Sequence, residues 1–261
     1  MAKGSGKRNL TKKEVKNIVQ DELKVELEYK TAVIGANSTL INKAAIPNGD
    51  VTASTNFHPI FPVITQGSGQ YNKRVGNEIR LKSLNIKGLL NFQDGDGGSG
   101  NNNYRNNTLG IRVMILRQKD QNSYLGLIED FQGNKLLENG EISSPGPSAF
   151  TGTTFNLLQR INRDQFSVRY DKVLYIERSR EFNSGSGTLQ FNRGPRPVTF
   201  DHDLTFGKQG LKLTYGKGDS VESTNFPYVM VVGMASTIDG TTPSDDLVEL
   251  SYTANAKYTD A

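Results

Sequence analysis

Basic side chains near the start of the chain have the clearest capacity to bind a ligand. The first 20 residues hold six of them against one acid, Glu14, a net charge of +5, whereas the whole chain carries only +4. Because Lys and Arg neutralise phosphates and release counterions, we predict that this segment binds nucleic acid, although a solubilising tail would have the same composition. The predicted nucleic-acid-binding residues are Lys3, Lys7, Arg8, Lys12, Lys13 and Lys16.

Metal sites are not indicated by the two histidines of the chain. His202 shares the apolar parity of its strand and is predicted to be a core histidine, and His58 is predicted to lie in a loop without a partner. The stretch Asp94–Gly100 resembles a calcium loop, but its sixth position is Ser99 and its twelfth would be Arg105, where an EF-hand needs Gly and Glu. We therefore expect a flexible loop there, and we predict no metal and no cofactor.

Enzyme signatures are likewise missing from the sequence. It contains no cysteine, no G-x-S-x-G elbow, no Walker A loop and no H-E-x-x-H helix. We expect that the protein is not an enzyme and has no catalytic residue. Apolar runs stay well below the roughly 20 residues of a membrane span, and the first ten residues lack the apolar core of a signal peptide, so we expect neither membrane insertion nor a secretory signal.

The elements that would carry these residues are mostly strands. A Gly- and Lys-rich start is predicted to be disordered, and the Thr11 to Glu14 capping box predicts a helix over about 12–21. Strict apolar–charged alternation predicts a strand over 23–30, and residues 31–76 are predicted to be mostly loop, with a short edge segment at 56–63. Further strands are expected from 79, 109, 166, 198, 211, 228 and 248, the one at 228–235 buried on both faces.

Two further features refine this prediction. The apolar parity flips within the strand that starts at 79, which predicts a β-bulge near Lys82 and Ser83. Long polar loops are expected at 120–165, with a short helix near 123–131, and at 178–197, where they would contact neighbouring subunits or form the outer surface. The expected fold is all-β, a single eight-stranded jelly-roll sandwich over 23–261 preceded by a basic arm with a short helix over 1–22.

Four segments of the chain resemble, in order, capsid proteins of circular, Rep-encoding single-stranded DNA viruses, a circovirus-like group. Residues 67–83 are similar to the segment "Q-G … R-[IV]-G-x-x-I-x-L-x-S", and 164–172 to "F-x-V-[LYR]-x-D-K". Glu28-Tyr29-Lys30 is similar to the short strand that opens those domains, and 256–260 resembles their terminal "Y-x-D".

This resemblance implies a subunit that assembles with copies of itself into a small icosahedral shell around single-stranded DNA. It also implies a virion protein that assembles in the host nucleus and meets an unknown host receptor. The arm has one Arg and five Lys, whereas circovirus arms are long and Arg-rich, so we expect either that inner-wall residues share the binding of the genome or that packaging is only weakly charge-matched. Two alternatives remain open: a carbohydrate-binding β-sandwich, and a single-stranded nucleic-acid-binding protein that forms no shell.

Overall fold

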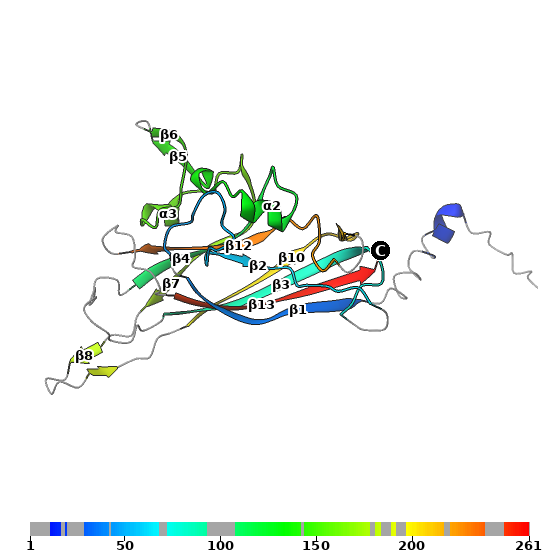
Figure 1. The fold of residues 1–261 in the computed structure, drawn as a ribbon, viewed down its shortest axis with the longest axis horizontal. Helices are drawn as coiled ribbons and strands as arrows, with labels where there is room; N and C mark the ends of the chain where they lie inside the picture. The colour runs from blue at the N-terminus through cyan, green and yellow to red at the C-terminus, as the bar shows by residue number, and fades with distance from the viewer. Residues whose placement is uncertain are drawn as a thin grey trace, which may run out of the picture.

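The chain folds as an all-β sandwich of antiparallel sheets, seen in a computed structural model (Figure 1). Sheet 1 has the order β1 (Lys30–Ile41), β13 (Val248–Asp260), β3 (Glu78–Phe92), β10 (Val198–Thr205). Sheet 2 has the order β2 (Phe57–Pro59), β12 (Val229–Ser236), β4 (Thr108–Gln118), β7 (Phe166–Glu177). The structure describes residues 11–16, 19, 29–41, 43–67, 72–92, 108–141, 144–177, 181–183, 189–191, 197–216, 220–237 and 248–260.

This strand order is that of a jelly roll. The chain alternates between the sheets at each of these strands except from β4 to β7, which are neighbours in sheet 2. A short strand, β11 (Leu211–Thr214), continues along the β3 edge that β10 occupies. Within the described residues the two sheets therefore hold nine strands, whereas the predicted eight included β11 and left out β2. Within the described residues two hairpins lie outside the sandwich, β5 (Leu137–Glu141) with β6 (Ser144–Ser148) and β8 (Glu181–Asn183) with β9 (Leu189–Phe191).

The predicted β-bulge is present at Lys82. In the pairing of β3 with β13, Ser83 is opposite Lys257 and Leu81 is opposite Tyr258, which leaves Lys82 as the extra residue. The break between β10 and β11 lies at the same place, because the backbone N–H of Phe206 donates to the Lys82 carbonyl. The inward parity of β3 therefore changes from Leu81 to Leu84 while both side chains stay in the core.

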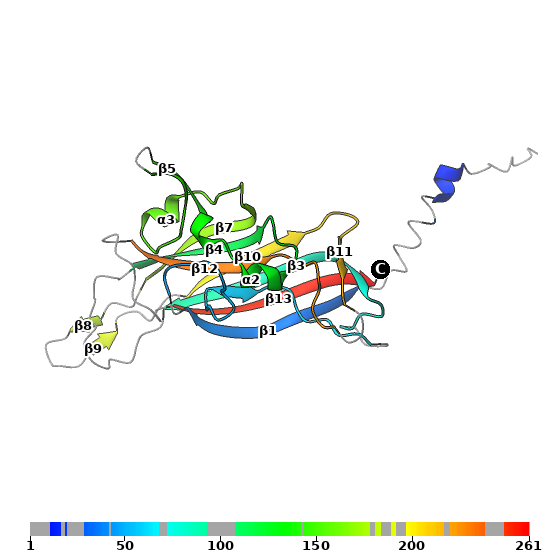
Figure 2. The same ribbon diagram turned by 45° about the horizontal axis from the view of Figure 1, so that its top comes forward.

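A second apolar layer covers the outer face of sheet 2, so the prediction that 120–165 is too polar to contribute to the core is wrong. The segment contains α2 (Tyr124–Glu129), a 3₁₀ turn η1 (Gly133–Lys135) and α3 (Phe155–Leu158) (Figure 2). The predicted short helix is confirmed as α2, whose cap is the Ser123 hydroxyl. Large apolar side chains of the segment are buried against β4, namely Phe131, Leu136, Leu137, Phe150 and Leu157. As a result β4 is buried on both faces, as β12 is.

The region 31–76 also departs from the predicted loop, because β1 occupies Lys30–Ile41. A bulge between Ile34 and Asn37 interrupts its pairing with β13, so the apolar alternation that would have indicated a strand is lost. Of the strand predicted at 23–30, residues 23–28 lie outside the described residues. The edge segment predicted at 56–63 is confirmed as β2.

The capping box is confirmed at the start of the arm helix. The Thr11 backbone N–H donates to Glu14 Oε2 at 2.8 Å, and the Glu14 N–H donates to Thr11 Oγ1 at 3.3 Å. Residues 12–16 and 19 are helical, and the rest of the predicted 12–21 helix, with the domain boundary at 22, lies outside the described residues.

Candidate nucleic-acid interface

Half of the predicted arm residues fall within the described structure. Lys12, Lys13 and Lys16 are exposed on the short helix, whereas Lys3, Lys7 and Arg8 lie outside the described residues. Hydrogen bonds from the Thr11 backbone and hydroxyl lower the pKa of Glu14, so the one acid beside these lysines stays ionised. Nucleic-acid binding by the six arm residues stays a prediction.

Residue Lys30 marks the place where the arm enters the sandwich. Its Nζ lies 2.6 Å from Asp260 Oδ2 and donates to the Lys73 carbonyl at 3.0 Å. Asp260 Oδ1 in turn accepts a hydrogen bond from the Val75 N–H at 3.2 Å. These bonds join the start of β1, the end of β13 and the segment before β3, which are three of the segments that carry the family resemblance.

The buried Arg74 fixes the same end of the molecule. Its side chain is fully buried, it donates to the Ser220 carbonyl at 2.7 Å, and its guanidinium carbon lies 4.2 Å from the centre of the Tyr215 ring. Because it is inaccessible and bound to carbonyls, Arg74 holds the chain segments together and does not present charge to a ligand.

A set of basic residues gathers on the solvent face of sheet 1 at this end, and we call it the basic end. The register places Lys212 of β11 directly opposite Arg80 of β3, although like charges in that position destabilise a sheet. Lys257 of β13 is opposite Ser83, one step further along. The basic end consists of four strand residues, Arg80, Lys82, Lys212 and Lys257, together with Lys208 in the turn between β10 and β11.

Few of these charges are neutralised within the described residues. Lys212 pairs with Glu78 at 2.9 Å, and Lys82 donates to the carbonyls of Lys208 and Gln209 at 3.1 and 3.2 Å. Lys257 Nζ lies 4.3 Å from the centre of the exposed Tyr29 ring. In the described part of the chain no carboxylate forms an ion pair with Arg80, Lys208 or Lys257. Partly uncompensated cations beside an exposed aromatic ring suit phosphates and stacked bases.

The same face carries acids further along the strands. Asn85 Nδ2 donates to Asp201 Oδ1 at 2.8 Å and to Asp203 Oδ1 at 2.7 Å, and Lys87 pairs with Asp201 at 3.2 Å. The hydrogen bond from Asn85, followed by that from Lys87, lowers the pKa of Asp201. The face is therefore polarised along its strands, with excess positive charge where the arm joins the sandwich.

The basic end has no local signal in the sequence. Its cations alternate with core residues within strands, and residues 80, 212 and 257 are brought together only by strand pairing. No sequence motif specifies which strands pair, although the expectation that inner-wall residues share nucleic-acid binding with the arm is consistent with such a surface.

The two histidines have structural surroundings. His202 points inward and is half-buried, with its ring centre 4.6 Å from that of Tyr170, as expected for a core histidine. His58 was wrongly placed in a loop: it belongs to β2, is 2% exposed, and packs its ring against Tyr252 with centres 5.6 Å apart. Burial lowers the pKa of His58 to about 4.

The described residues contain neither a cluster of metal-ligating side chains nor a helix suited to crossing a membrane. No group of three or more His, Asp or Glu side chains there could hold a metal ion, and the calcium-like loop Asp94–Gly100 lies outside them. Among the described helices, none has the length and apolar character needed to cross a membrane.

Comparisons with known proteins identify weak structural neighbours. No protein-family model and no curated protein sequence matches the chain. It is similar to "Merkel cell polyomavirus VP1 in complex with GD1a oligosaccharide" with a TM-score of 0.13 and 8% identity, covering 100% of this chain and 84% of that one. It is similar to "infectious bursal disease virus VP2 subviral particle" with a TM-score of 0.13 and 9% identity, covering 89% of this chain and 41% of that one.

Both neighbours are viral capsid proteins, but likenesses of this size establish no shared topology. The jelly-roll assignment rests instead on the strand order of the two sheets. The narrower resemblance to capsid proteins of circular single-stranded DNA viruses has no family or sequence match beside it and remains a proposal.

Proposed function

We propose that the chain is a virus capsid subunit that assembles with copies of itself into a small icosahedral shell and packages single-stranded DNA. One observation carries the proposal: on a jelly-roll sandwich, the excess positive charge of sheet 1 lies where the basic arm joins it. A shell subunit needs its phosphate-binding groups on one side, because only one side faces the genome. The role is structural and needs no catalysis.

In this mechanism the arm and the basic end act together. The arm lysines neutralise phosphates without a fixed groove. Because the arm carries few charges, the cations of sheet 1 add a fixed phosphate-binding surface. The sandwich supplies a rigid wall, and loops between its strands supply contacts to neighbouring copies. The sequence resemblance supports a virion location, assembly in the host nucleus and a host receptor of unknown identity as parts of the same proposal.

The test is to purify the full chain and measure its particle size, its 260/280 absorbance ratio and nuclease protection of any bound nucleic acid. We expect closed, megadalton shells that protect single-stranded DNA. A monomer or dimer that binds single strands would favour a nucleic-acid-binding protein without a shell. Binding to immobilised glycans by a subunit that neither assembles nor binds DNA would favour the carbohydrate-binding alternative.

The arm is tested separately by deleting residues 1–20, which removes a net charge of +5. We expect shells that retain less nucleic acid, with a lower absorbance ratio and a weaker dependence of binding on salt. An unchanged ratio would contradict the role of the arm while leaving the shell itself in place.

A further inference from the structure

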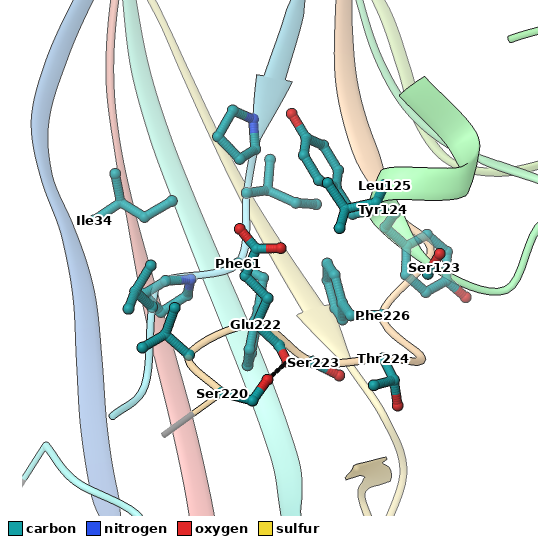
Figure 3. A pocket seen from close by; sticks show the side chains of 16 residues that line it. Ile34, Phe61, Ser123, Tyr124, Leu125, Ser220, Glu222, Ser223, Thr224 and Phe226 are labelled. Carbon is teal, nitrogen blue, oxygen red and sulfur yellow. Dashed lines mark hydrogen bonds between the residues drawn. The ribbon is translucent and has the colours of Figure 1, made fainter. Parts of the chain in front are cut away.

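An apolar pocket of about 600 Å³ opens between the end of β2, the start of α2 and the segment 220–226 (Figure 3). Its wall includes the stacked rings of Phe61 and Phe226, whose centres are 4.7 Å apart. Three more apolar residues of the lining are exposed: Val63 at 60%, Leu125 at 49% and Val221 at 38%. A pocket surrounded by exposed apolar side chains is a surface on which a partner can bury its own.

A matching apolar projection is found on α3. Phe155 and Leu158 are 74% and 75% exposed, and their spacing of three residues places them on one face of the helix. These are the two most exposed large apolar side chains of the described residues.

The helix that carries this projection is held rigidly. Asn156 Oδ1 accepts from the backbone N–H of Thr151 at 2.8 Å, and the Asn156 carbonyl accepts from Arg112 at 2.6 Å. Leu157 is buried above Gly110, where an added Cβ would lie 2.2 Å from its side chain. Phe155 and Leu158 are therefore displayed by a fixed support, which lowers the entropy lost when they bind.

The projection and the pocket lie at separate places on the molecule. In both ribbon views α3 is distant along the long axis from α2, whose first residues line the pocket (Figures 1 and 2). A contact between the two features therefore needs two copies of the chain. Their flanking charges are opposite, because Arg160 follows the projection and Glu222 lines the pocket, both exposed and neither in an ion pair within the described residues.

We propose that Phe155 and Leu158 of one copy insert into this pocket of a second copy, with Arg160 facing Glu222 across the contact. The two surfaces differ, so the contact is head-to-tail, a type that forms a ring when the rotation between successive copies closes. The inference rests on the proposed self-assembly and deepens it by naming one of its contacts.

Cysteine cross-linking tests the contact directly, because the natural chain contains no cysteine. A Leu158→Cys chain is mixed with a Val63→Cys chain under assembly conditions and oxidised mildly. We expect disulfide-linked dimers from this mixture. The matched control replaces Val63→Cys by Val33→Cys, whose residue is 55% exposed on sheet 1, and should give at least tenfold less product. No product from the first mixture, or equal product from both, would overturn the proposal.

A charge exchange provides an independent readout in the full chain. Arg160→Glu and Glu222→Arg should each raise the subunit concentration at which assembly begins, and the double variant should restore it. Single variants that assemble like the natural chain, or a double variant no better than either single one, would contradict the pairing. A natural chain that forms no shell would contradict the proposed function but not this contact. In that case cross-linked small oligomers would still show that the projection of one copy binds the pocket of another.

Discussion

Replacing Arg80 and Lys257 together by glutamine should weaken the binding of single-stranded DNA and flatten its dependence on salt. Neither cation has a carboxylate partner within the described residues, so each is free to neutralise a phosphate. Each phosphate contact with a single strand contributes about 0.7 to the slope of log K against log salt, so the pair accounts for about 1.4. At 0.1 M salt, relative to 1 M, that slope corresponds to an affinity lower by about 25-fold.

The assay is fluorescence anisotropy of a labelled oligodeoxynucleotide with unassembled subunits at several salt concentrations. The control is Lys87→Gln on the same strand as Arg80, since Lys87 is already paired with Asp201 at 3.2 Å. Lys212 is kept unchanged because Glu78 offsets its charge. An unchanged slope in the double variant, or the same decrease with Lys87→Gln, would refute the assignment of the basic end.

Three further predictions concern stability, measured by urea unfolding of unassembled subunits. Burial lowers the pKa of His58 to about 4, below its unfolded value near 6.5, so the unfolded chain binds the proton more tightly than the folded chain. The free energy of unfolding should therefore fall by about 2 kcal/mol from pH 7 to pH 5. His58→Leu should remove that loss, and an equal loss in the variant would contradict the prediction. Arg112→Met leaves the Asn156 carbonyl without its donor and the solvent-accessible Asp171 carboxylate without its ion-pair partner, and should cost about 1–3 kcal/mol; less than about 0.5 kcal/mol would refute the importance of these contacts. Gly133→Ala places a Cβ 2.2 Å from a backbone oxygen and should cost about 1–3 kcal/mol, whereas Gly35→Ala, with open space around it, should cost little; equal effects would contradict the clash.

Strands with one apolar face could be predicted from the sequence, and so could one irregularity. The alternation that ends the chain is β13, and the parity flip near Lys82 is the bulge that also separates β10 from β11. Two features of the fold could not be predicted from the sequence. The bulge in β1 removes its alternation, and β4 is buried on both faces only because the segment 120–165 that follows it folds back over it.

The candidate site also has one part that could be predicted from the sequence and one part that could not. A charge cluster contiguous in sequence, such as the arm, is visible without a structure. The basic end is not, because Arg80 and Lys212 are 132 positions apart and become neighbours only through the pairing of β11 with β3. The α3 projection was equally hidden, since its exposure depends on Leu157 and Asn156 facing the body while Phe155 and Leu158 face away.

A three-dimensional reconstruction of purified particles by electron cryomicroscopy tests the proposed function most directly. The account predicts a closed icosahedral shell in which the basic end of sheet 1 faces the interior, next to density for nucleic acid. A shell with that end facing outward, or a preparation that contains only monomers and dimers across assembly conditions, would contradict it.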